Sequence, residues 1–173
     1  MSRPPQVRLI PATVPLLTAL REDRARFARL IGAPAPDGWP EFPEAIDFTL
    51  ERLETTPETD HRWSMQFFVD AATGHLVGSG GFVGRPADRT VEIGYEIAPE
   101  ARGQGFGSAA ARALVERAVA SGEVDHVVAH TQPGPNASTG VLVSLGFDHV
   151  ADGTDPEIGT IWAWRWSRDG ERP

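Results

Sequence analysis

The chain divides into short stretches that follow one of two hydrophobic periods. Apolar residues at every second position, or in short unbroken runs, predict strands, whereas apolar residues three or four positions apart predict helices. The predicted strands cover residues 7–10, 63–69, 76–83, 90–97, 124–129, 148–151 and 160–166. The predicted helices cover residues 13–31, 43–54, 109–120 and 136–145.

These elements show no internal repeat and no linker-like segment between them. Strands interleaved with helices are typical of a mixed α/β architecture. A length of 173 residues suits one domain with a substantial hydrophobic core. The sequence therefore predicts a single α/β domain over residues 1–173, whose core covers residues 7–166.

The turn after the strand at 90–97 is the most informative segment of the chain. Gly103, Gly105 and Gly107 stand at every second position between that strand and the next helix. Because glycine has no Cβ, backbone N–H groups can come close to a ligand there. The start of a helix adds free N–H groups and a positive partial charge. This arrangement predicts a binding site for an anion such as a pyrophosphate.

Composition narrows the classes of function. The formal net charge of −8 argues against general nucleic-acid binding and is compatible with an amine-bearing substrate. All 16 basic residues are arginine, which excludes a Schiff-base lysine and a lysine-dependent phosphate loop. With no cysteine there is no thiolate nucleophile, and no histidine spacing is typical of a metal site, so we expect no metal. Because no apolar run is long enough for a membrane span and no secretion signal is recognisable, we expect a cytoplasmic protein without membrane contact.

Two motifs follow one another along the chain. The first is Glu92-Ile93-Gly94-Tyr95 followed by Arg102-x-x-Gly105-x-Gly107, and the second is Asn136-Ala137-Ser138 followed by Leu145-Gly146-Phe147. Together they resemble the motifs of the GCN5-related N-acetyltransferase (GNAT) superfamily, most of all its RimJ/RimL-like branch. The resemblance implies a central, mostly antiparallel sheet of about six or seven strands, splayed at its middle and flanked by about four helices.

The resemblance also implies an activity. GNAT proteins transfer the acetyl group of acetyl-coenzyme A directly to a primary amine, so we expect an N-acetyltransferase acting on a protein N-terminus or a small-molecule amine. The absence of cysteine is consistent with transfer that needs no acetyl-enzyme intermediate. Family habit and the tryptophan-rich last strand also suggest a homodimer.

The residues that match the coenzyme site of the family can be named in this chain. The main chain of Ile97 matches the strand that pairs with the pantetheine arm. Arg102 opens the pyrophosphate loop, and Asn136 and Ser138 match positions near the pantetheine arm and the sulfur. The amides expected to hold the pyrophosphate belong to Gly103, Gln104, Gly105, Phe106, Gly107 and Ser108.

Two glutamates are candidates for handling the amine. Glu92 and Glu96 share one face of their strand, because side chains alternate along a strand, and Gly94 leaves room between them. Charged residues seldom occupy a central strand for packing reasons. We expect Glu92 to act as the general base and Glu96 to bind the substrate; the alternative is that either one faces solvent or pairs with an arginine.

Other candidates are fewer. Many relatives protonate the coenzyme sulfur with a tyrosine near the second motif, but the single tyrosine here, Tyr95, falls on the core-facing side of its strand. We therefore expect Ser138 to serve as the proton donor. Trp39, on a proline-rich loop, is expected to contact the substrate, and His130 is the histidine best placed to face the site. The alternating tryptophans of the last strand are expected to be buried.

Two other functions are compatible with parts of the sequence. The glycine turn also satisfies the dinucleotide fingerprint, which would indicate an oxidoreductase, but the following strand ends without the acidic residue that this fingerprint requires. The missing family tyrosine would also suit a non-catalytic acyl-coenzyme A sensor. The acetyltransferase explains both motifs and is the preferred hypothesis.

Overall fold

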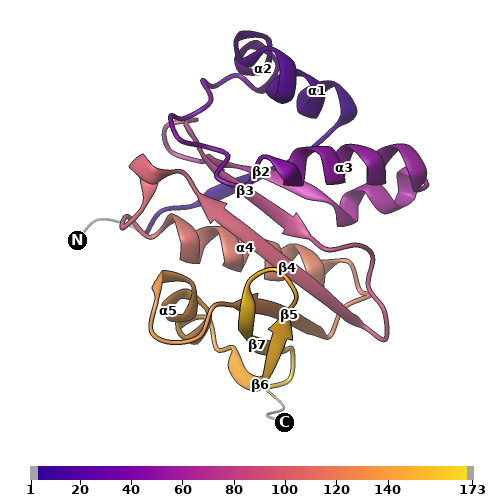
Figure 1. Ribbon diagram of the computed structural model, residues 1–173, viewed down its shortest axis with the longest axis vertical. Coiled ribbons are helices and arrows are strands. Elements are labelled where there is room, and N and C mark those ends of the chain that lie inside the picture. The colour runs from indigo at the N-terminus through magenta and orange to yellow at the C-terminus, as the bar shows by residue number, and fades with distance from the viewer. Residues whose placement is uncertain (1–3, 171–173) are drawn as a thin grey trace.

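The computed structural model, which describes residues 4–170, is built around one seven-stranded mixed sheet. The outermost residues of the predicted domain, 1–3 and 171–173, lie outside the described residues. The strand order is β1-β2-β3-β4-β5-β7-β6, and every neighbouring pair is antiparallel except β4 and β5 (Figure 1). The strands are β1 (Val7–Pro11), β2 (Met65–Asp70), β3 (Leu76–Phe82), β4 (Thr90–Ile97), β5 (His126–Thr131), β6 (Asp148–Asp155) and β7 (Gly159–Ser167). The predicted mixed fold is confirmed.

Five α-helices flank the sheet in the described part of the chain, one more than the sequence predicted. They are α1 (Val14–Glu22), α2 (Arg24–Ile31), α3 (Glu44–Thr55), α4 (Phe106–Ala120) and α5 (Ala137–Ser144). The single helix predicted over 13–31 is wrong, because Asp23 leaves the helical conformation at φ −150° and ψ 89°. Its side chain accepts a hydrogen bond from the Arg26 N–H and begins a second helix there.

The helices cover opposite faces of the sheet. Alternation along the strands sends Phe67 to one face and Phe68 to the other, and both are fully buried. On the Phe67 side the sheet packs against the first three helices, and on the Phe68 side it packs against α4 and α5. Figure 1 shows α3 lying in front of β2 and β3 with α4 behind β4. The site described below lies at the end of β4, between the two helix layers.

The pairing of β4 with β5 is short. It joins Thr90 to His126, Val91 to Val127 and Glu92 to Val128, and then ends. On its other side β4 stays paired with β3 as far as Ile97. Residues 93–97 therefore have no strand partner on the β5 side within the described chain. The expected splay at the middle of the sheet is confirmed.

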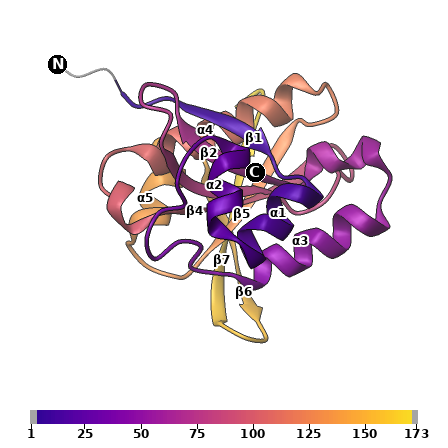
Figure 2. The same ribbon diagram turned by 90° about the horizontal axis from the view of Figure 1, so that it is seen from above.

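The last two strands form a hairpin that extends beyond the body of the molecule, as Figure 2 shows in yellow. Trp164 of β7 is buried, and its indole N–H donates to the Thr131 hydroxyl over 2.9 Å. Trp162 and Trp166 pack against the same cluster on the Phe68 side. The predicted burial is therefore confirmed for Trp164, whereas Trp162 and Trp166 are only partly buried. Separately, none of the helices among residues 4–170 is long and apolar enough to cross a lipid bilayer.

Candidate active site

The larger of two adjoining cavities lies in the gap opened by the splay. It encloses about 540 Å³ between the end of β4, the glycine turn and the first turn of α5. Its lining residues are Glu41, Phe42, Tyr95, Glu96, Ile97, Ala101, Arg102, Gly103, Gly105, Gly107, Ser108, Ala137, Ser138 and Val141. This volume falls within the usual range of about 300–1,000 Å³ for small-molecule sites.

The start of α4 faces this cavity with free backbone donors. Gly105 occupies the N-cap position at φ 87°, and no side chain caps the helix. Gly103 also has a left-handed φ of 72°, a conformation that glycine adopts without strain. At Gly107 a Cβ would lie 3.3 Å from the Val141 side chain, so glycine lets α4 and α5 approach closely. An uncapped helix start of this kind is suited to an anion.

The other residues of the predicted pyrophosphate loop have distinct roles. Arg102 donates from Nε to the Ile97 carbonyl at 3.0 Å and from a terminal nitrogen to the Glu41 carboxylate at 2.6 Å, tying the turn to β4. The Gln104 side chain is bound to the Glu100 carbonyl. Phe106 is buried in the core beneath the helix start. The side chains of Gln104 and Phe106 thus brace the turn, and their backbone amides are what they can offer a ligand.

The second motif begins α5. Asn136 caps this helix: its side chain accepts from the Thr139 N–H and donates to the carbonyls of Gln132 and Gly134. Those contacts occupy its amide, and Asn136 is not among the residues that line the larger cavity. Ser138, two residues further along the chain, does line the larger cavity. Of the two residues predicted from this motif, the structure brings Ser138 to the cavity.

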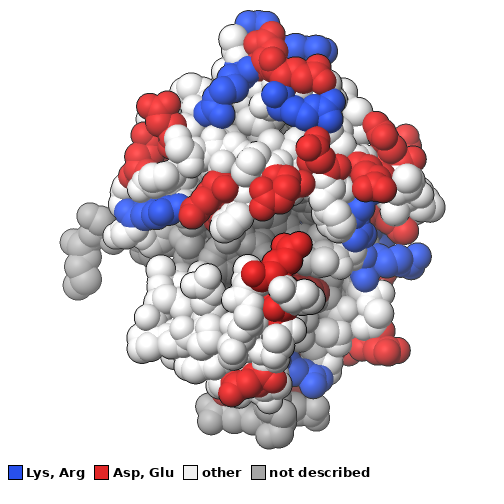
Figure 3. All heavy atoms as spheres, in the orientation of Figure 1, with Lys and Arg blue, Asp and Glu red and all other residues white. Residues whose placement is uncertain are grey.

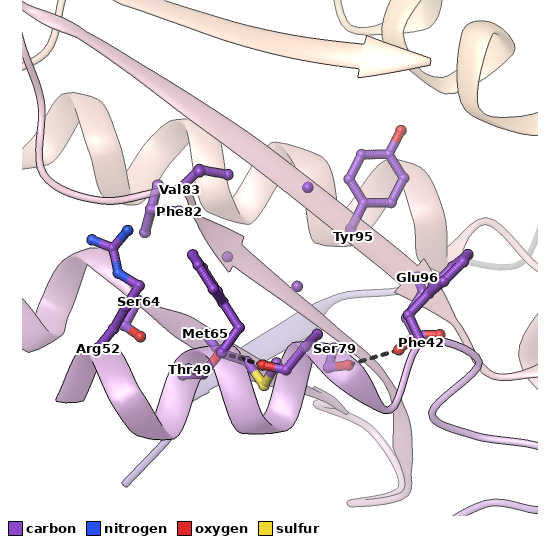
Figure 4. Close-up of a pocket in the computed structure, with 15 residues that line it drawn as sticks. Phe42, Thr49, Arg52, Ser64, Met65, Ser79, Phe82, Val83, Tyr95 and Glu96 are labelled. Carbon is purple, nitrogen blue, oxygen red and sulfur yellow. Dashed lines mark hydrogen bonds between the residues drawn. The ribbon is translucent and has the colours of Figure 1, made fainter. Parts of the chain in front are cut away.

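The smaller cavity lies on the opposite face of β4 and encloses about 230 Å³. Residues of α3 form one wall, and β3 and β4 form the floor (Figure 4). Of the glycines in the floor, Gly94 has open space where a Cβ would stand, whereas a Cβ at Gly80 or Gly81 would meet neighbouring backbone atoms. The apolar side chains that line it are Phe42, Phe48, Met65, Phe82 and Val83. Phe42, Tyr95 and Glu96 line both cavities, so the two adjoin at the end of β4.

Glu96 is held firmly at this junction. One carboxylate oxygen accepts from the Glu41 N–H at 2.8 Å, and the other accepts from the Ser79 hydroxyl at 3.4 Å. Burial raises the pKa of the Glu96 carboxyl above its ordinary value, while these two hydrogen bonds oppose the rise. The carboxylate is therefore fixed in position and more basic than an exposed glutamate.

Trp39 lies in the core, with 2% of its surface exposed. Its ring packs between Phe27 and Phe67, which leaves the indole no free surface for a substrate. Instead its N–H donates to the Ser79 hydroxyl at 3.2 Å. Because Ser79 in turn donates to Glu96, Trp39 acts on the site through that serine. This corrects the expectation of direct substrate contact.

Glu92 points from the same face of β4 as Glu96, as the alternation predicted. Its carboxylate lies 2.9 Å from Nδ1 of His130, and both side chains are about one-third exposed. Neither residue is among those that line the two cavities. His130 therefore pairs with Glu92 at the base of the splay, and Glu96 is the glutamate that the structure brings to both cavities.

Tyr95 carries a hydroxyl that is buried without a hydrogen-bond partner. Its ring packs against the core cluster, as expected, and also lines both cavities. Burial raises the pKa of Tyr95, so the phenol stays protonated at neutral pH. Figure 4 shows the ring on the opposite side of β4 from Arg52, with the hydroxyl directed away from the smaller cavity.

Several lining residues escaped the sequence analysis. Ser79 and Glu41 bind the Glu96 carboxylate, and Phe42 and Arg52 line the smaller cavity. The pairing of Ser79 with Glu96 depends on the register between β3 and β4, which strand alternation alone does not fix. The others lie on α3 or the loop before it, whose position over the sheet depends on tertiary packing.

Charged side chains of both signs line the two cavities: Glu41, Glu96 and Arg102 line the larger one, and Arg52 and Glu96 line the smaller one. Figure 3 shows a hollow across the middle of this face, with both acidic and basic side chains on the surface around it. Among residues 4–170 no group of three or more histidine, aspartate or glutamate side chains is arranged to hold a metal ion.

Comparison with known proteins gives consistent results. The family described as acetyltransferase (GNAT) domain matches residues 8–148. A ribosomal-protein-S5-alanine acetyltransferase from Vibrio fischeri has a TM-score of 0.64 at 18% identity, covering 100% of this chain and 98% of its own. RimJ from Mycobacterium smegmatis, in complex with CoA-disulfide, has a TM-score of 0.62 at 18% identity, covering 96% and 87%. A spermidine N-acetyltransferase SpeG chimera from Vibrio cholerae and hSSAT has a TM-score of 0.67 at 15% identity, covering 95% and 96%.

No curated protein matches the sequence significantly. The structural likenesses, all below 25% identity, establish the fold. The family match covers most of the chain, and it spans the splayed strands and the uncapped glycine turn. The protein is a GNAT-family N-acetyltransferase, of the class that uses acetyl-coenzyme A.

Proposed function

We propose that this enzyme transfers the acetyl group of acetyl-coenzyme A directly to a primary amine that reaches the junction through the smaller cavity. The observation that carries this proposal is the position of Glu96, which lines both cavities where they adjoin. A coenzyme in the larger cavity and an amine in the smaller one would meet beside its carboxylate. The protein therefore gains its catalytic effect first by positioning the two reactants.

Three features of the larger cavity fit the pyrophosphate and the pantetheine arm of coenzyme A. The uncapped start of α4 offers N–H groups to the phosphates. The unpaired edge of residues 93–97 offers backbone groups to the amides of the pantetheine arm. The orphaned Tyr95 hydroxyl offers one more polar partner beside them. Gly103, Gly105, Gly107 and Ser108 would hold the phosphate end.

The bound coenzyme supplies an activated acetyl thioester. An amine enters as an ammonium ion, and Glu96, with its raised pKa, is placed to accept the proton that must leave before nitrogen attacks. The new C–N bond forms as the C–S bond breaks; the nitrogen then loses its second proton, which balances the proton that the departing sulfur gains. Ser138 is the cavity-lining hydroxyl that the second motif supplies for this step. We assign the base role to Glu96 in preference to Glu92, because Glu92 lines neither cavity.

The proposal is tested by release of the coenzyme thiol from acetyl-coenzyme A in the presence of a broad panel of amines. We expect acetylated amine and free thiol in equal amounts. Calorimetric binding of coenzyme A, without any thiol release above background, would contradict catalysis and leave a coenzyme-binding sensor. Failure to bind coenzyme A would contradict the assignment of the larger cavity.

A further inference from the structure

The smaller cavity has chemically different ends. Figure 4 shows Arg52 at one end and Glu96 at the other, with apolar side chains between them. Three of these, Phe42, Phe48 and Val83, are each more than half exposed. Large apolar side chains gathered around one hollow indicate a binding surface for an apolar group. The volume of about 230 Å³ restricts that group to a small one.

Arg52 is available to a ligand. No carboxylate of residues 4–170 lies within 4.0 Å of its guanidinium. Three and four positions away along α3 stand Phe48, Thr49 and Thr55, so the helix supplies no acidic neighbour on that face.

The guanidinium also has two close neighbours. It lies 5.6 Å from the centre of the Phe48 ring, a cation–π contact. A Cβ at position 84 would come within 2.9 Å of an Arg52 terminal nitrogen, so Gly84 permits the close approach. An unpaired guanidinium that lines a cavity is suited to holding a carboxylate with two parallel hydrogen bonds.

We propose that the acceptor is a small primary amine whose apolar body carries a carboxylate at the end remote from the amine. This inference rests on the proposed function of the site. Glu96 receives the ammonium end, the apolar walls receive the body, and Arg52 binds the carboxylate. A polyamine would instead place a second positive charge against Arg52, which the geometry disfavours.

Three amines built on the same para-substituted benzene ring test this proposal directly. They are 4-(aminomethyl)benzoate, 4-methylbenzylamine and p-xylylenediamine, which carry a negative, a neutral and a positive group opposite the same aminomethyl group. We expect kcat/KM to be highest for the carboxylate, about tenfold or more above the neutral amine, and lowest for the diamine. The preference should appear in KM more than in kcat, because Arg52 lies far from the reacting nitrogen.

Two substitutions at Arg52 separate charge recognition from packing. Arg52→Met keeps a long apolar side chain over Phe48, and we expect the ratio of carboxylate to neutral-amine turnover to fall to about 1 when that charge-assisted hydrogen bonding is lost. Arg52→Glu should reverse the order and favour the diamine. Arg29→Met, on the exposed surface of α2, is the control and should keep the parental ratio.

The outcomes distinguish this inference from the proposed function. Equal kcat/KM for the three amines, or an Arg52→Met variant that keeps the carboxylate preference, overturns the inference while acetyl transfer stands. No turnover of any amine by a protein that binds coenzyme A overturns both. A higher kcat/KM for the diamine than for the carboxylate in the parental enzyme shows that Arg52 does not select the acceptor.

Discussion

Ser79 and Glu96 face each other across β3 and β4, and the serine hydroxyl donates to the glutamate carboxylate over 3.4 Å. The same hydroxyl accepts the indole N–H of Trp39 at 3.2 Å. Because that acceptor role fixes the direction of the hydroxyl proton, Ser79 is left to donate toward Glu96. A buried tryptophan thereby orients the carboxylate at the junction of the two cavities.

The roles of the two glutamates can be separated by substitution. Glu96→Gln keeps the shape of the side chain and removes its basicity, so kcat should fall by about 100-fold or more if proton acceptance is its role. Glu92→Gln changes a residue that lines neither cavity, and its kcat should stay within a few-fold of the parental value. Steady-state kinetics with one amine, and calorimetry to show unchanged coenzyme affinity, test both. The reverse ranking would restore Glu92 as the base.

The pH dependence of turnover should report Glu96. Its carboxylate is the active form, so kcat/KM falls as the pH drops through its pKa, which burial raises above that of an ordinary glutamate. The hydrogen bond from Ser79 lowers this pKa, and Ser79→Ala should therefore move the acidic limb to higher pH. The profile of Glu96→Gln should lack that limb. An unmoved limb in Ser79→Ala would show that another group titrates.

The glycine turn can be tested with a matched pair. Gly103 and Gly122 both have a left-handed φ, 72° and 76°, with open space where a Cβ would stand. A valine at either position imposes similar backbone strain, on the order of 1–3 kcal/mol. Only Gly103 lines the larger cavity, so Gly103→Val should weaken coenzyme A binding by more than about tenfold, whereas Gly122→Val should not. Calorimetry measures the coenzyme A affinity of both variants. An equal loss of affinity in the two would indicate a general effect on folding.

Removal of the Tyr95 hydroxyl should affect the stability of the free protein and the binding of coenzyme A in opposite directions. A buried polar atom without a partner costs about 1–3 kcal/mol, so Tyr95→Phe should raise the melting temperature of the free protein by about 2–4 °C per kcal/mol recovered. If the bound coenzyme supplies the missing partner, the same variant should bind it less tightly. Thermal melts with and without coenzyme A measure both effects. A lower melting temperature for the free variant would show that the hydroxyl already has a partner.

Much of the fold could be predicted from local signals. Alternation alone predicts the strand at 90–97, and the predicted helices at 13 and 136 begin at Thr13 and Asn136, whose side chains cap them. The break at Asp23 was missed because the apolar spacing of Leu20 and Phe27 continues across it. A single capping aspartate there outweighs the periodicity.

The candidate site was predicted less completely, for a physical reason. Backbone features, such as the glycines of the turn, are encoded by residue type at a fixed spacing. The environment of Glu96 depends on the register between strands and on the position of the loop that carries Glu41. The burial of Trp39 between Phe27 and Phe67 could not be predicted, because it arises from elements far apart in the sequence. Such contacts have no local pattern.

The short ladder between β4 and β5 has an evolutionary implication. Past Glu92 the open edge presents peptide groups, which every residue type except proline possesses in full. Recognition through such groups places little demand on side-chain identity, so mutations can accumulate along the strand while the docking surface persists. Selection can then act on the acceptor end independently.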